Sequence, residues 1–190
     1  AKRLRLFRKI HRFTGACLFI FFFVVSMSGL LLGWKKHSQG VILPKTQKGA
    51  STNPQDWKSL DELQVIAKGV ANGIVSPKFG SDKVDRMDVR PSKGIVKVLF
   101  KDDFREIQLD MTTGEMLSLE RRYSDLIEKI HDGSILDRSL STSDDYFKLF
   151  YTTLMGGSLL IFTITGFWLW FGPKLIKRRR DLQQVKETEV

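Results

Sequence analysis

The chain has 190 residues, a formal net charge of +10 and one cysteine. Its excess of positive charge lies in residues 1–12 and 174–190, with net charges of +6 and +3, while residues 35–148 carry only +1. Because the one segment long enough for a soluble domain is almost neutral, we do not expect nucleic acid as a partner.

Two uncharged apolar runs, residues 13–34 and 149–173, dominate the pattern. A transmembrane helix needs about 20 mostly apolar residues, so each run is long enough to span a bilayer. The first run is longer than the apolar part of a signal peptide, and no cleavage pattern follows it, so we interpret it as an uncleaved anchor.

The basic ends next to both runs predict the orientation of the chain. Cytoplasmic flanks of transmembrane helices are enriched in Lys and Arg, so residues 1–12 and 174–190 are expected in the cytoplasm and the central segment outside. These cations also favour anionic lipid headgroups. Trp34, Trp168 and Trp170 close the runs, as expected for membrane boundaries. Cys17 lies within the first run and is expected to be a small packing residue.

Residues 35–58 are rich in Gly, Pro and small polar residues and are expected to be a linker. A helical pattern then begins at Ser59, with Leu60, Leu63, Ile66, Ala67 and Val70 at helical spacing and a stop at Asn72-Gly73. Ser59 and Glu62 have the spacing of a capping box. This helix opens a predicted domain over residues 59–120.

Alternating apolar residues predict strands after this helix. They are Met87 and Val89; Val96, Val98 and Phe100; Ile107 and Leu109; and a last segment near residues 115–119. Turn signals separate them at residues 91–94, at Asp102-Asp103 and at residues 112–114. We therefore expect an antiparallel meander of three or four strands, covered by one helix. Two transmembrane helices plus this small α+β domain is the predicted fold class.

Residues 121–148 are expected to connect this domain to the second span. The segment 121–130 is an amphipathic helix whose apolar stripe packs on the domain or rests at the membrane surface. It ends at His131-Asp132-Gly133, where glycine is typical of a helix stop.

Several of these features together resemble the PepSY-associated transmembrane helix family. The matching segments are Arg8–Gly15, Ser28–Leu32, the helix with its meander, His131–Gly133, Thr165–Trp170 and Pro173-Lys174. The resemblance implies a PepSY-like domain in the periplasm, between two passes through a bacterial inner membrane. Some relatives with more spans reduce siderophore-bound iron and carry haem on membrane histidines, whereas this chain has two spans.

The three histidines, His11, His37 and His131, are therefore candidate ligands of haem b. Haem ligation by two histidines needs imidazoles that face each other across one iron. His11 and His37 are 26 residues apart, roughly 39 Å along a continuous helix, so these two cannot share an iron. Within a monomer, His131 and His37 are the only pair expected on the same side of the membrane. His11 could ligate haem only together with a histidine of a partner chain. The alternatives stay open: His11 as an interfacial side chain, His37 as a solvated residue, and His131 as a cation at a helix end.

Small residues give each span a face for close helix packing, at Gly29 and Gly33 in the first and at Gly156 and Gly157 in the second. These faces pair the two spans with each other or contact another membrane subunit. The sequence shows no Cys/His cluster at zinc spacing, no phosphate-binding glycine loop and no nucleophile elbow. The acidic pairs Asp102-Asp103 and Asp144-Asp145 sit where turns and helix starts are expected.

The leading functional hypothesis is an accessory or interaction subunit, with no catalytic residue assigned, that joins a larger membrane assembly. Its PepSY-like domain would engage another membrane or periplasmic protein, or a second copy. The alternative is a haem-binding component of a membrane electron-transfer or ferric-siderophore reductase system. A further alternative is inhibition of an extracytoplasmic peptidase.

Overall fold

A computed structural model describes residues 2–74, 83–101, 104–139 and 146–188, which form two compact units. One unit contains Ala1–Ser28 and Ile130–Val190, and the other contains Gly29–Lys129. The acidic pairs Asp102-Asp103 and Asp144-Asp145 lie outside the described residues, so their expected turn and helix-start positions stay predictions.

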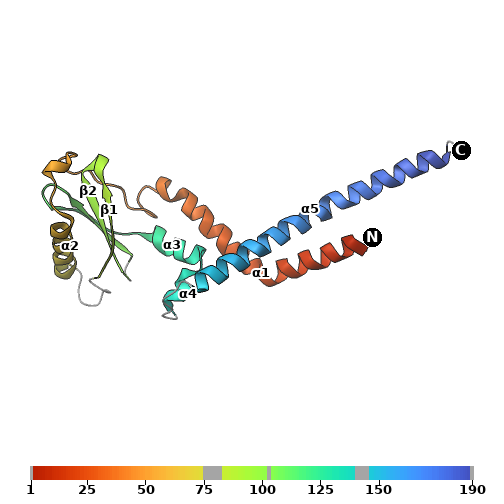
Figure 1. Ribbon diagram of the computed structural model, residues 1–190, viewed down its shortest axis with the longest axis horizontal. Helices are drawn as coiled ribbons and strands as arrows, with labels where there is room; N and C mark the ends of the chain where they lie inside the picture. The colour runs from red at the N-terminus through yellow and green to blue at the C-terminus, as the bar shows by residue number, and fades with distance from the viewer. Residues whose placement is uncertain (1, 75–82, 102–103, 140–145, 189–190) are drawn as a thin grey trace. The chain divides into compact units, whose positions relative to one another are not determined.

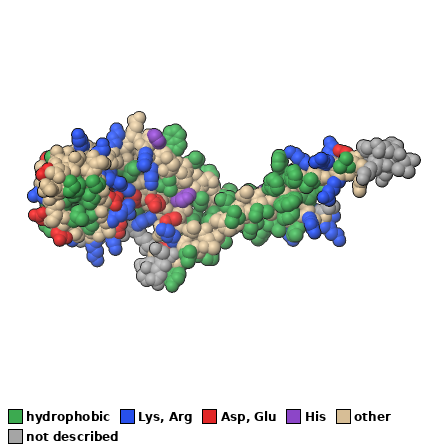
Figure 2. Space-filling view, turned by 45° about the horizontal axis from the view of Figure 1, so that its top comes forward, with side chains coloured by type: hydrophobic (Ala, Val, Ile, Leu, Met, Phe, Trp, Pro, Cys, Tyr) green, Lys and Arg blue, Asp and Glu red, His purple; other side chains and the backbone are tan. Residues whose placement is uncertain are grey.

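Two long helices, α1 (Lys2–Trp34) and α5 (Tyr146–Thr188), make up most of the first unit (Figure 1). Both are long and apolar enough to cross a membrane, as the two uncharged runs predict. Exposed apolar side chains cover the long helices, and a group of Lys and Arg follows toward the C-terminus (Figure 2). The short helix α4 (Ser134–Ser139) contacts the first turn of α5. The carboxylate of Asp137 accepts hydrogen bonds there from the amides of Phe147 and Lys148.

The contact between α1 and α5 uses other glycines than those expected from the sequence. A Cβ at Gly15 would lie 3.1 Å from the ring of Phe162, and one at Gly172 would lie 2.6 Å from Leu4. A Cβ at Gly33, Gly156 or Gly157 would meet nothing within 4 Å among the described residues. Gly156 and Gly157 therefore take no part in the contact between α1 and α5 within the long-helix unit, and contact of the expected glycines with another membrane subunit stays a prediction. Cys17 is exposed, so its expected role as a small packing residue stays a prediction.

The central unit contains the expected helix and a four-stranded antiparallel meander (Figure 1). After the 3₁₀ turns η1 (Lys35–His37) and η2 (Pro54–Asp56) come helix α2 (Leu60–Ile74) and strand β1 (Val84–Arg90). The 3₁₀ turn η3 (Pro91–Lys93), strands β2 (Ile95–Phe100), β3 (Arg105–Asp110) and β4 (Met116–Arg121), and helix α3 (Tyr123–His131) follow. The strand order is β1-β2-β3-β4, which confirms the predicted fold class.

The core lies between α2 and one face of the sheet. Leu63, Ala67 and Ala71 on α2 pack against the alternating residues Val96, Val98, Phe100, Ile107 and Leu109, together with Met111. Each large aliphatic side chain buried in this way contributes about 1.5–3 kcal/mol. The capping box is also confirmed, since the backbone amide and the hydroxyl of Ser59 both donate to Glu62 and the amide of Glu62 donates back to Ser59 Oγ.

The segment expected to be a linker makes backbone hydrogen bonds to the domain. The amide of Gln47 donates to the side chain of Gln108, and the amide of Ala50 donates to Asp110. Gly94 has a left-handed φ of 63°, and a Cβ there would collide with the carbonyl oxygen of Ser51. Because Gln108 and Asp110 alternate with the core residues Ile107 and Leu109, this segment lies across the face of the sheet opposite α2.

Candidate functional site

His131 is hydrogen-bonded inside the long-helix unit. It is the last residue of α3, and its Nδ1 lies 2.9 Å from the Oγ of Ser28 on α1. Gly133, two residues later, has a φ of 78° and is buried against Tyr151. The glycine therefore ends the helix as predicted, and the histidine also bonds to the first span.

His11 makes a similar contact at the other end of the two long helices. Its Nδ1 lies 3.0 Å from the Oγ1 of Thr165 on α5, and its ring stacks on Phe162 with 3.9 Å between the centroids. A Cβ on Gly166 would lie 3.4 Å from this imidazole, so the glycine leaves room for it. His11 thus faces the second span, which differs from the alternative of a side chain directed at lipid headgroups.

The two hydroxyl groups also hydrogen-bond to backbone carbonyls, which is compatible with a proton on Nδ1 of each histidine. Ser28 Oγ donates to the carbonyl of Val24 at 2.6 Å, and Thr165 Oγ1 donates to the carbonyl of Ile161 at 2.7 Å. When the single hydrogen of each hydroxyl is donated to the carbonyl, the hydroxyl oxygen accepts a hydrogen bond from Nδ1–H of the histidine. In a neutral imidazole this leaves the lone pair on Nε2, and no described residue hydrogen-bonds to Nε2 of either histidine.

Asp132 makes hydrogen bonds and an ion pair that do not involve His131. Its carboxylate accepts hydrogen bonds from the amide and hydroxyl of Ser134 and pairs with Lys148 Nζ at 2.9 Å. Burial by itself raises the pKa of Asp132, but the hydrogen bonds from Lys148 and Ser134 and the charge of Lys148 lower it below its usual value. Asp132 therefore holds the α3–α4–α5 connection together, and Ser28 orients the imidazole.

A small cavity of about 220 Å³ lies beside His131. Its walls are mostly apolar and include Phe22, Val25, Met155 and Leu159. Ligand pockets typically enclose about 300–1,000 Å³, so this cavity alone is smaller than the usual site for a cofactor. A large planar ligand at Nε2 of His131 would extend beyond this cavity and would need additional protein surface around it.

His37 lies in the 3₁₀ turn that follows α1 and is exposed. Its ring contacts Trp34 edge-on, with 6.4 Å between the centroids. Its pairing with His131 stays a prediction. Among the described residues, no group of three or more His, Cys, Asp or Glu side chains could hold a metal ion.

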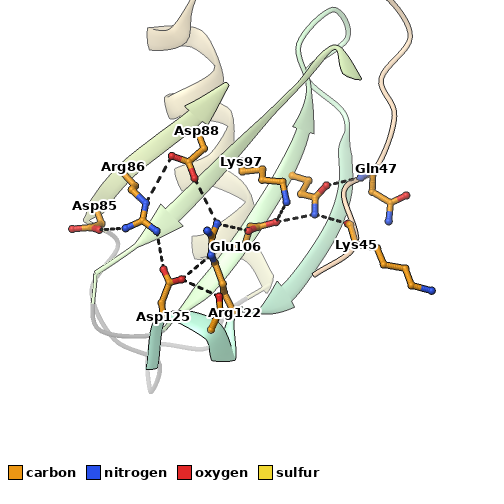
Figure 3. A network of polar contacts seen from close by, with 11 residues as sticks. Lys45, Gln47, Asp85, Arg86, Asp88, Lys97, Glu106, Arg122 and Asp125 are labelled. Atoms are coloured by element: carbon orange, nitrogen blue, oxygen red, sulfur yellow. Dashed lines mark hydrogen bonds and ion pairs between the residues drawn. The ribbon is translucent and has the colours of Figure 1, made fainter. Parts of the chain in front are cut away.

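A second polar cluster lies in the central unit, on the sheet face opposite α2 (Figure 3). The buried carboxylate of Glu106 accepts hydrogen bonds from Lys97 Nζ at 2.8 Å, Gln108 Nε2 at 2.8 Å and Arg122 Nη1 at 2.9 Å. Burial opposes the charge of Arg122, but the carboxylates of Asp125 and Glu106 outweigh it and raise the pKa of Arg122. These hydrogen bonds and ion pairs connect Arg122, just before α3, with Glu106 on the sheet, and they hold the start of α3 against the sheet.

Ser28 and Thr165 were missing from the site residues proposed from the sequence, although both occur in the motifs that carry the family resemblance. A signal for them exists in the sequence. Each is a hydroxyl residue followed by glycine inside an otherwise apolar run. Because antiparallel spans bring the start of one next to the end of the other, each hydroxyl meets the histidine that precedes the opposite span.

A comparison with protein families now bears on this arrangement. Residues 8–186 match the PepSY-associated TM region, and this range includes most of both long helices, both imidazole–hydroxyl pairs and the central domain. The chain belongs to the PepSY-associated TM region family. Comparisons with curated proteins and with solved structures find no significant match.

Membership of the PepSY-associated TM region family agrees with the architecture: two candidate membrane-spanning helices flank a central α+β region with a four-stranded antiparallel sheet. The chain is therefore a membrane protein.

Proposed function

We propose that this protein is a subunit of a bacterial inner-membrane assembly that binds haem b through His11 and His131. One observation carries this function. Nδ1 of each histidine is hydrogen-bonded to a hydroxyl on a long helix, Ser28 on α1 or Thr165 on α5, which would leave Nε2 for a ligand. Histidine ligands of metals almost always have their second nitrogen hydrogen-bonded in this way.

The residues fit haem only in an assembly. Acceptor hydroxyls at Ser28 and Thr165 would favour a proton on Nδ1 and leave Nε2 for iron, and the cavity beside His131 has apolar walls. Ser28, which contacts His131, is 17 residues from His11 on α1, about 25 Å along the helix. His11 and His131 therefore lie at two different depths along the long helices. A second imidazole at each depth would come from a second copy or another subunit. Haem held there would supply one-electron transfer.

The orientation follows from the charges next to the two spans. Residues 1–12 and 174–190 would lie in the cytoplasm, and the nearly neutral central domain would lie in the periplasm. His11 would then be near the cytoplasmic end of the spans and His131 near the periplasmic end. In that position the central domain would engage the envelope partner that an accessory subunit requires.

The deciding measurement is an absorption spectrum of the full chain, purified in mild detergent from haem-replete cells, in its oxidised and reduced forms. We expect a Soret band that shifts on reduction and is weakened or lost in His131→Ala and in His11→Ala. A normal spectrum in His37→Ala supports ligation across subunits, whereas its loss would assign the ligand pair to His37 and His131 instead. A wild-type protein without a Soret band would contradict haem binding.

A further inference from the structure

The basic end of the long-helix unit contains a cleft beyond the uncharged parts of the helices. Helices α1 and α5 remain in contact there, since Phe7 stacks on Trp168 with 6.2 Å between centroids and 6° between planes. Gly172 packs against Leu4 one turn further along. Phe7 precedes the uncharged run by six residues, about 9 Å along the helix, which corresponds to the headgroup level of a bilayer.

The cleft has the size of a ligand pocket and two kinds of wall. Its volume is about 730 Å³, within the range of sites that enclose small molecules. One wall is apolar and includes Leu4, Phe7, Trp168 and Ile176. The other presents the cations of Lys2, Arg3 and Arg179.

The cations of this cleft have no acidic partner among the described residues. No carboxylate lines the cleft, and no described ion pair involves Lys2, Arg3 or Arg179. Cations that lie side by side repel one another unless an anion neutralises them. A cationic rim above an apolar wall therefore fits a ligand that carries a phosphate and a long apolar chain on one molecule.

We propose that this cleft is a binding site for an anionic phospholipid. The lipid phosphate lies among Lys2, Arg3 and Arg179, and an acyl chain lies along Leu4, Phe7 and Ile176. Basic pockets between transmembrane helices bind such headgroups, and each nearby Lys or Arg adds to the attraction. A soluble phosphate compound would use the cations but would leave the apolar wall uncovered.

The test is native mass spectrometry of the full chain after incubation with phosphatidylcholine alone or with added phosphatidylglycerol or cardiolipin. The triple variant Lys2→Gln, Arg3→Gln and Arg179→Gln should lose at least tenfold in retention of the anionic lipid. The matched variant Arg5→Gln, Arg8→Gln and Lys9→Gln removes the same charge from another surface of α1 and should change retention less than threefold. Equal losses in the two variants would show only diffuse attraction and would overturn the site.

A variant that keeps the charge of the protein distinguishes binding in the cleft from general electrostatic attraction of the lipid. Ile176→Trp should fill the apolar wall and reduce lipid retention about tenfold, with the protein still eluting as a folded species. Unchanged retention in Ile176→Trp would contradict the site. Full competition by inorganic phosphate would identify a soluble anion as the occupant and would also overturn the proposal of a lipid.

Discussion

The Oγ of Ser28 lies 2.9 Å from the Nδ1 of His131, although the two residues are 103 positions apart in the chain. Since Ser28 donates its own hydrogen to the Val24 carbonyl, it serves His131 as an acceptor. The contact ties the first span to the end of α3 and holds the imidazole in place. Its removal is therefore the most direct test of the candidate site.

Ser28→Ala should leave the fold intact and weaken any ligand bound at Nε2 of His131. Outer hydrogen-bond partners of metal ligands typically contribute 10–100-fold in affinity, and we expect haem retention to fall by this factor. The control is Ser26→Ala, on the same helix but exposed. Absorption titration with haem checks both variants. Equal affinities in the two would contradict a role for Ser28 in orienting the ligand.

Thr165→Val removes the hydroxyl that accepts from His11 while it keeps the side-chain shape. Hydrogen bonds between membrane helices contribute about 0.6 kcal/mol on average and at most about 1.7 kcal/mol, so we expect a loss in this range. Thr163→Val is the matched control, because the Thr163 hydroxyl is exposed and bonds only to its own helix among the described residues. Reversible unfolding in mixed micelles measures the difference.

Gly133→Ala should destabilise the junction of α3 and α4 by about 1–3 kcal/mol, because a residue with a side chain rarely adopts a left-handed conformation. Its Cβ would also lie 2.7 Å from the ring of Tyr151. Gly156→Ala serves as the comparison, since a Cβ at this helical position meets nothing within 4 Å. Thermal unfolding of the full chain in detergent should separate the two. A Gly133→Ala protein as stable as the Gly156→Ala protein would refute the conformational requirement.

Glu106→Gln should strongly destabilise the central unit, because Lys97 would remain buried without its carboxylate. Removing one partner of a buried ion pair typically costs about 3–5 kcal/mol. Adding Lys97→Met should recover part of this loss, since the unpaired charge is then removed. Hydrogen exchange at the amides of β2 and β3 in the full chain reports the change. Faster exchange in the double variant than in the single one would contradict this account.

Acidification should loosen the connection through Asp132. Because the pKa of this carboxyl is lowered in the folded protein, its contribution is present above the usual pKa of 3.8 and is lost as the pH falls through the lowered value. Hydrogen exchange at the start of α5, followed from pH 6 to pH 3 and corrected for the intrinsic rate, should show this loss. In Asp132→Asn the same amides should be less protected at pH 6 and should lose little further protection on acidification.

The sequence by itself determined the two spans, an antiparallel meander of three or four strands and helix α2, because local periodicity and turn residues decide these elements. Alternation of apolar residues placed Val96, Val98 and Ile107 on one face of the sheet, and they do form its core. The stop at Gly133 was equally readable, since few residues besides glycine suit a left-handed helix end.

Only the tertiary structure decided which distant residues meet. The antiparallel arrangement of α1 and α5 joins His11 to Thr165 and places Gly15 and Gly172 in their contact, while Gly156 stays outside it. The end of α3 brings His131 to Ser28. The glycine pattern could not reveal this, because small residues occur on several faces of a helix and local spacing does not specify which face meets a neighbour. The rotation of each long helix about its axis depends on packing across the whole interface, and that rotation gave each histidine its hydroxyl partner.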